Sequence, residues 1–164
     1  MSHSGYALYL APPQDSDLWS FGCRVIGRDA WTGQAVDGFA PDGLEPEAWR
    51  KLTSEPRRYG LHATLKAPFR LRADVDVFDL LDAVEGFART QKPFNAGRLD
   101  VGQMSAGDRR GFVDLKPEGA SRELHSLADS AVRALDGMRA PLSDAERGHR
   151  AKRASFGNLS FASS

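Results

Sequence analysis

The sequence has a single cysteine, no excess of charge of either sign and no long apolar run, and each shortage excludes a class of protein. Cys23 cannot form a disulfide within the chain, and zinc sites built from several cysteines are excluded. The 22 basic and 22 acidic side chains cancel, whereas proteins that coat nucleic acids or bind membrane surfaces usually need excess positive charge. The longest apolar stretches are far shorter than the ~20 residues of a bilayer span. We therefore expect neither membrane association nor general nucleic-acid binding.

The rest of the composition is typical of a globular protein. With 164 residues, of which 41% are apolar, the chain is long enough for one domain with its own core. The first six residues carry neither the cationic region nor the apolar run of a secretory signal. We therefore expect a cytoplasmic globular domain.

Hydrophobic periodicity predicts strands and helices in alternation. Strands are predicted at residues 6–11, 59–71, 99–104 and 111–115, and helices over about 16–26, 45–53, 76–90 and 121–136. The last two strands are close enough for a hairpin. In the first helix, Leu18, Phe21 and Val25, with Trp19 as a further candidate, are predicted to form the apolar side. The order β-α-α-β-α-β-β-α predicts an α+β fold with helices packed on a mainly antiparallel sheet.

The most unusual segment runs from Arg57 to Phe69, with the sequence RRYGLHATLKAPF. On a strand, alternate side chains share a face, so His62, Thr64 and Lys66 are predicted to lie together. A histidine can move a proton near neutral pH, a threonine hydroxyl can donate to an oxyanion, and a lysine adds positive charge. These groups suit a phosphoryl or carboxylate ligand. Alternation alone favours a simpler interpretation, which is a polar sheet face in contact with water.

The residues around this segment are further candidates for ligand binding. Guanidinium groups pair well with phosphate oxygens, so we predict that Arg57 and Arg58, with the adjacent Tyr59, help to bind the ligand. A solvated turn is the alternative for both arginines. Tyr6 and Tyr9 are three positions apart, so at most one of them faces a cleft if their strand is regular.

The string YGLHATLKAPF at 59–69 resembles the first signature of the two-histidine phosphoesterase superfamily, which is His-x-Thr followed by an apolar residue. Within it, the string is most similar to the family associated with bacterial phosphonate-metabolism operons. The segments 6–13, 18–29 and 133–142 also resemble that family, so the resemblance covers about residues 6–146. It implies two similar lobes around a cleft, each with one His-x-Thr/Ser motif. One histidine would act as base and the other as acid, without a metal or another cofactor.

A second motif of this kind is not found in the sequence. None of the other histidines, His3, His125 and His149, is followed two positions later by threonine or serine. The segment 158–161 has asparagine in place of histidine, and asparagine cannot transfer a proton near neutral pH. The resemblance therefore implies a phosphoesterase-like domain over residues 1–146 with an incomplete second lobe. We expect residues 147–164 to be a divergent, poorly ordered basic and polar tail.

Three explanations for the missing motif stay open. The chain is truncated or frame-shifted, or it is a natural short variant that binds a ligand without turnover, or a distant histidine or a second subunit completes the site. The leading functional hypothesis is a 2′,3′-cyclic-phosphodiesterase-like protein that acts on cyclic or diester phosphates of a small molecule. The alternatives are a catalytically deficient binding protein and a structural or partner-binding domain.

A truncated second lobe would also affect the surface. It would leave the helix face of Leu124, Leu127, Ala131 and Leu135 poorly covered. Because exposed apolar patches promote association, we expect either a homodimer through this face or poor solubility.

Overall fold

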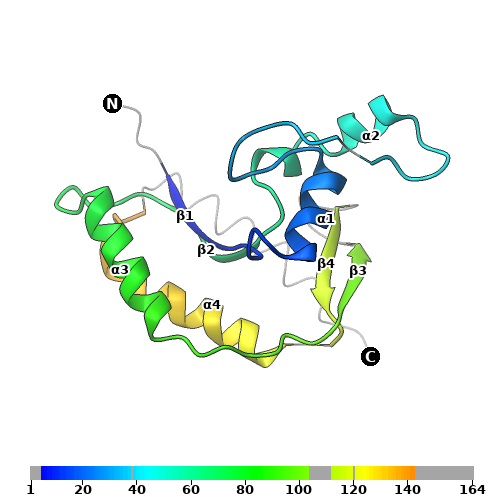
Figure 1. Cartoon of the computed structure of the whole chain (residues 1–164). Helices are drawn as coiled ribbons and strands as arrows, with labels where there is room; N and C mark the ends of the chain where they lie inside the picture. Colours follow the sequence, from blue (N-terminus) through cyan, green and yellow to red (C-terminus); the bar gives the residue numbers. More distant parts are fainter. Residues whose placement is uncertain (1–4, 38, 104–111, 120, 143–164) are drawn as a thin grey trace, which may run out of the picture. The chain divides into compact units, whose positions relative to one another are not determined.

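The computed structural model describes residues 5–37, 39–103, 112–119 and 121–142, and its elements follow the predicted order (Figure 1). The elements are β1 (Tyr6–Leu10), α1 (Asp17–Ile26), α2 (Pro46–Leu52), β2 (Ala63–Phe69), α3 (Val77–Arg89), β3 (Leu99–Gln103), β4 (Val113–Pro117) and α4 (Arg122–Leu135). Short 3₁₀ turns at Pro56–Arg58 and Asp136–Met138 come before β2 and after α4. The predicted tail and the turn of the predicted hairpin lie outside the described residues.

The α+β class is confirmed, but the described strands form two small antiparallel sheets in place of the single sheet that we predicted. One sheet pairs β1 with β2. The other is a hairpin of β3 and β4, with Leu99 opposite Pro117 and Gln103 opposite Val113. Pro68 and Pro117 lie within β2 and β4, and a proline offers no N–H to a neighbouring strand. The two-lobed plan stays a prediction.

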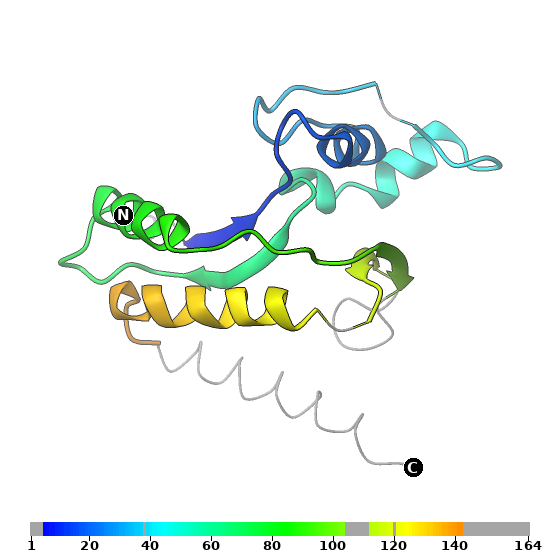
Figure 2. The same cartoon turned by 60° about the horizontal axis from the view of Figure 1, so that its bottom comes forward.

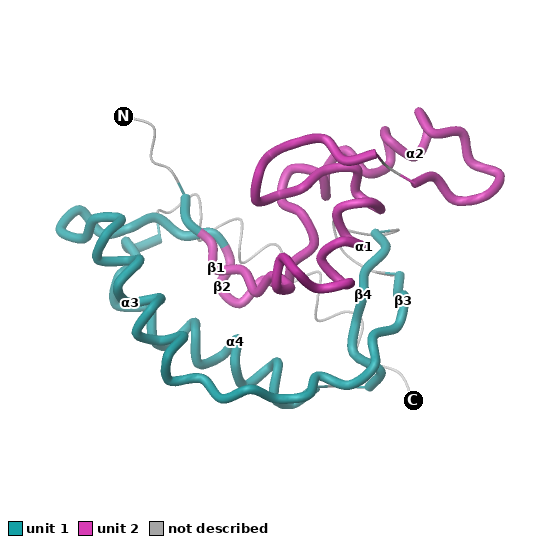
Figure 3. Tube along the Cα trace, viewed as in Figure 1, with its two compact units in different colours: residues 1–6, 68–164 teal, residues 7–67 magenta. Residues whose placement is uncertain are grey.

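The chain divides into two compact units (Figure 3). Residues Ala7–Ala67, magenta and labelled unit 2 in Figure 3, form the unit that we call the first. Met1–Tyr6 and Pro68–Ser164, teal and labelled unit 1 there, form the second. The buried apolar side chains of the first unit are Trp19, Cys23, Ile26 and Leu65, and those of the second are Phe69, Leu80, Ala131 and Leu135. Each unit therefore buries its own small set of apolar side chains.

Helix α1 begins and ends as the sequence predicts but buries a different face. The Ser16 hydroxyl accepts a hydrogen bond from the Trp19 amide, and Gly27 ends the helix in the left-handed conformation. The buried residues are Trp19, Gly22, Cys23 and Ile26, whereas the predicted Phe21 is 51% exposed and Leu18 and Val25 are half-buried. Leu61 packs so closely on Gly22 that a Cβ atom there would lie 2.7 Å from the Cβ of Leu61. The buried face of α1, which includes this closely packed glycine, therefore lies about one residue further along the helix than we predicted.

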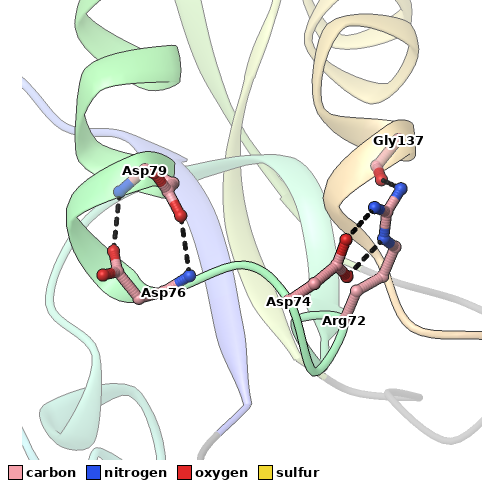
Figure 4. A network of polar contacts seen from close by, with 5 residues as sticks. All are labelled: Arg72, Asp74, Asp76, Asp79 and Gly137. Atoms are coloured by element: carbon pink, nitrogen blue, oxygen red, sulfur yellow. Dashed lines mark hydrogen bonds and ion pairs between the residues drawn. The ribbon is translucent and has the colours of Figure 1, made fainter.

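Helix α3 is held at its start by reciprocal hydrogen bonds (Figure 4). The Asp76 carboxylate accepts from the amides of Phe78 and Asp79, and Asp79 accepts from the Asp76 amide at 2.9 Å. Asp76 is therefore the N-cap, and the nearby Asp74 instead pairs with Arg72 through two hydrogen bonds. The Arg72 guanidinium holds the pKa of Asp74 below its usual value.

The segment after β2 runs beside the end of α4. Arg72 donates to the Gly137 carbonyl at 2.8 Å (Figure 4), and its amide donates to the Met138 carbonyl at 3.0 Å. The Ala140 amide donates to the Arg70 carbonyl at 2.7 Å. These bonds join residues about 65 positions apart within the second unit.

Helices α3 and α4 contact each other within the second unit, and Figure 2 shows α4 along its length. Ala131 and Leu135 are 0% and 1% exposed, and Leu124 and Leu127 are half-buried. The prediction that this face is poorly covered is therefore wrong at its C-terminal half. Ala131 and Leu135 therefore offer no apolar surface to a second copy of the chain, and a homodimer stays a prediction.

Candidate functional site

His62 lies at the entrance to β2, one residue before the strand begins at Ala63. We predicted that the strand would start at residue 59. Instead, Pro56 starts a 3₁₀ turn, and Gly60 follows in the left-handed conformation with φ of 75°. Glycine adopts this conformation without the steric cost that other residues meet. The turn thus delays the strand and leaves His62 as the residue that precedes it.

The imidazole of His62 is oriented by a hydrogen bond to the main chain. Its Nδ1 atom lies 2.8 Å from the Gly60 carbonyl oxygen. A carbonyl oxygen can only accept, so Nδ1 carries the hydrogen of this bond. In the neutral ring, Nε2 is then the nitrogen with the free lone pair. The half-buried His62 side chain can therefore accept a proton at Nε2.

Two tyrosine rings contact this imidazole. Tyr9 of β1 stacks on His62 with ring centroids 3.8 Å apart and planes 26° apart. Tyr59 meets it edge-on at 6.3 Å, and its side chain is 53% exposed. Tyr9 is thus the member of the predicted Tyr6/Tyr9 pair that lies at the candidate site. The sequence could not show this contact, because it depends on the pairing of β1 with β2.

Thr64 and Lys66 lie on β2 at alternate positions, as the pattern predicts, but their surroundings differ. Thr64 is exposed, whereas Lys66 is only 5% exposed and the preceding Leu65 only 8%. Consecutive residues of a strand point to opposite faces, so both faces of β2 are covered at this point. The simple interpretation of a water-facing polar strip is therefore wrong at Lys66.

Arg57 is used inside the fold. Its Nε donates to the Ile26 carbonyl at 3.0 Å, and one terminal nitrogen donates to the Arg50 carbonyl at 3.1 Å and to the Thr53 hydroxyl at 2.7 Å. These acceptors lie at the ends of α1 and α2. Arg57 therefore joins two helices to the turn before His62, a role that our sequence analysis did not predict.

Arg58 is in a different environment from Arg57. Its side chain is 68% exposed and lies 3.8 Å from the Glu55 carboxylate. An exposed ion pair of this length contributes little to stability, so the guanidinium is available to an anionic ligand. Ligand binding by Arg58, and by the other predicted residues, stays a proposal.

Arg28 is a residue of this region that sequence analysis did not single out as part of the site. One of its terminal nitrogens donates to the carbonyls of Arg57 and Arg58, at 3.0 and 3.5 Å. It follows the glycine that ends α1, and nothing in its local pattern distinguishes it from a solvated arginine. The role of Arg28 is visible only in the structure, where the loop after α1 lies close to the turn before His62.

Cys23 is unsuited to nucleophilic chemistry. Burial, with a further contribution from the nearby Asp29 carboxylate, raises the pKa of its thiol. The thiol is therefore protonated at neutral pH, and the thiolate is the reactive form. Its packing in α1 accounts for its position.

The rest of the described chain offers three further observations. Its helices include none with the length and apolar character of a bilayer-spanning segment, and it contains no group of three metal-ligating His, Cys, Asp or Glu side chains. The second unit has an open cavity of 610 Å³. Its lining is Arg70, Leu71, Arg72, Ala73, Asp74, Ala140 and Pro141, which includes none of the predicted site residues.

Comparisons with known proteins give a family and two relatives. The family described as "Protein of unknown function (DUF1045)" matches residues 64–156, more than half of the chain. A ribose 1,5-bisphosphate phosphokinase PhnN from Laribacter hongkongensis (strain HLHK9) is 31% identical over 140 residues, which are 83% of this chain and 31% of the relative. Another, from Janthinobacterium sp. (strain Marseille), is 33% identical over 145 residues, which are 88% of this chain and 31% of the relative. This chain thus spans about a third of each relative's length. No solved structure matches it.

Proposed function

This chain belongs to the family described as "Protein of unknown function (DUF1045)", and from that premise we propose that it is a phosphoesterase-like protein acting on cyclic or diester phosphates. The observation that carries the proposal is the geometry of His62. Its Nδ1 is bonded to the Gly60 carbonyl, and Tyr9 is stacked on its ring. Nε2 is left to exchange a proton with a ligand at the start of β2.

The proposed reaction requires one proton transfer by His62. Nε2 takes the proton from a water or hydroxyl that attacks phosphorus, or, when the ring is charged, gives a proton to the leaving oxygen. It cannot do both in one step. The Thr64 hydroxyl donates a hydrogen bond to a phosphate oxygen, and Arg58 and Tyr59 hold the ligand from the preceding turn. A general acid or base of this kind contributes about 10²–10⁴-fold to the rate.

The relatives support a phosphorylated pentose as the first ligand class to test, because their name refers to ribose 1,5-bisphosphate. Phosphoryl transfer from a nucleotide commonly uses a Gly-x-x-x-x-Gly-Lys-Ser/Thr loop, and the sequence contains no such string. We therefore propose that the matched third of the relatives does not bind the nucleotide. In this proposal it acts on a cyclic or diester phosphate of a related sugar, in phosphonate or nucleotide metabolism.

Hydrolysis of a panel of cyclic phosphates, including pentose and nucleoside 2′,3′-cyclic phosphates, tests this proposal. We expect turnover by the wild type and a loss of about 10²–10⁴-fold in His62→Gln. The matched control is His125→Gln, because the Nδ1 of His125 also lies close to a main-chain carbonyl, that of Ser121, at 2.9 Å. Turnover that His62→Gln leaves unchanged would overturn the assignment.

A second candidate function is ligand binding without turnover, which the lack of a second His-x-Thr/Ser motif in the sequence favours. Calorimetry with the same compounds separates the two functions, since this candidate predicts binding by a wild type that hydrolyses none of them. In either case, Thr64→Val removes one hydrogen bond to the phosphate. We expect it to weaken binding by about 0.5–1.5 kcal/mol. Unchanged affinity would remove Thr64 from the site.

A further inference from the structure

We infer that Arg28 and Gly60 are positioning residues that select the Nδ1–H tautomer of His62. The inference rests on the proposed function for its catalytic meaning, since only that tautomer leaves Nε2 free to act as a base. The tautomer itself is a property of the folded chain and can be measured without a substrate.

The Gly60 carbonyl accepts the hydrogen bond from His62, and its position is fixed by the surrounding main chain. Gly60 has a φ of 75°, and its amide donates to the Pro56 carbonyl at 2.9 Å. It also packs directly on Ala30, since a Cβ atom at Gly60 would lie 2.4 Å from the Cβ of Ala30. The peptide that carries the acceptor is thus held by its own turn and by the loop after α1.

The side chain of Arg28 holds the main chain of this turn through hydrogen bonds. Its guanidinium reaches the carbonyls of Arg57 and Arg58, so it fixes the main chain of the turn immediately before Gly60. The same side chain donates to the Gly33 carbonyl at 3.4 Å. Arg28 therefore ties its own loop and the turn before His62 into one arrangement.

The loop that carries Arg28 and Ala30 is itself closed by hydrogen bonds between its own residues. Arg28 forms a β-bridge with Ala35, and the Asp29 amide donates to the Gln34 carbonyl at 3.0 Å. The Asp29 carboxylate accepts from the amide of Trp31 at 2.8 Å. A loop closed by these bonds can hold Ala30 against Gly60.

The position of the Gly60 carbonyl decides which of its two neutral tautomers His62 adopts. With the Gly60 carbonyl in place, the proton is held on Nδ1. If the turn moves, the proton distributes between both nitrogens, and a ring protonated at Nε2 cannot accept a proton there. Loss of Arg28 is therefore expected to lower the fraction of competent base while Tyr9 still stacks on the ring.

Long-range ¹H–¹⁵N correlation spectra of the full chain, recorded at a pH where His62 is neutral, report the tautomer directly. We expect the wild type to show the proton on Nδ1. In Arg28→Ala, the ratio of the Nδ1–H to the Nε2–H form should fall about fivefold, as expected for loss of one hydrogen bond of ordinary strength. Arg28→Lys should lie between the two, because one ammonium group replaces the planar fork.

The matched control is Arg24→Ala, which removes an exposed arginine from the last turn of α1. It should leave the tautomer unchanged. The backbone amide spectrum of each variant shows whether it folds. If Arg28→Ala does not fold, Gly60→Ala combined with Ala30→Gly serves as the second variant, because it removes the Cβ contact and keeps only the strain at φ of 75°.

A wild type with the proton on Nε2, or a folded Arg28 or Gly60 variant that keeps the wild-type ratio, would overturn the inference. A wild type with the Nδ1–H form but no turnover on any cyclic phosphate would instead contradict the proposed hydrolysis. The two failures are therefore distinguishable.

Discussion

Arg57 and Arg58 are adjacent and chemically identical, but they occupy different environments. Arg57 donates to oxygen atoms at the ends of two helices, and one of its acceptors, Thr53, is only 6% exposed. Arg58 makes one long ion pair at the surface. A guanidinium that satisfies main-chain carbonyls is costly to remove, because the carbonyls lose their partners.

We therefore expect Arg57→Ala to lower the free energy of unfolding by about 1.5–3 kcal/mol, the range for hydrogen bonds to a charged group. Arg58→Ala should change it by no more than about 0.5 kcal/mol. Urea unfolding followed by tryptophan fluorescence measures both, since Trp19 and Trp49 lie in the same unit. Equal effects of the two substitutions would contradict the structural role of Arg57.

At the scale of elements, two helical glycines differ in what surrounds them. Gly22 in α1 is buried against Leu61, whereas a Cβ atom at Gly86 in α3 would meet nothing within 4 Å. Both cost their helices conformational entropy relative to alanine. Only Gly22 offsets this cost, because it allows α1 to pack closely on Leu61.

Gly22→Ala should lower the melting temperature, because overpacking costs about 1–3 kcal/mol and exceeds the gain in helix propensity. Gly86→Ala should raise it, through a gain of about 0.5–1 kcal/mol. Thermal unfolding followed by circular dichroism compares the two variants with the wild type. A stabilising Gly22→Ala would mean that α1 does not pack on Leu61 as described.

For the whole molecule, the decisive quantity is a formal net charge of zero at pH 7. Without net repulsion between molecules, exposed apolar side chains can associate. Several such side chains are present, among them Trp31, Val101 and Phe78, which are 76%, 74% and 69% exposed.

We expect the solubility of the protein to be lowest near pH 7 and to rise on either side, where the charges no longer cancel. Precipitation by polyethylene glycol over a series of pH values measures this. Added salt should shift the curve little at the minimum, because there is little net repulsion to screen. A solubility that changes in one direction only across neutral pH would contradict this expectation.

Local signals in the chain were enough to predict the order of the elements. Alternating apolar residues, caps such as Ser16 and Asp76, and stops such as Gly27 act within a few positions, so each can be recognised without knowledge of the fold. The string around His62 also pointed to the region where a tyrosine stack and an oriented imidazole occur. The start of β2 was less predictable, because the turn at Pro56 and the conformation of Gly60 compete with the strand pattern.

Contacts between distant positions could not be predicted in this way. The bond from Arg57 to Ile26 spans 31 positions and that from Arg28 to Arg57 spans 29. The same holds for the stacking of Tyr9 on His62, the burial of Lys66 and the rotated face of α1. Each depends on which elements lie side by side, and a side chain takes its partner from that arrangement. Periodicity along one segment therefore specified that segment, and packing among segments assigned the roles of its side chains.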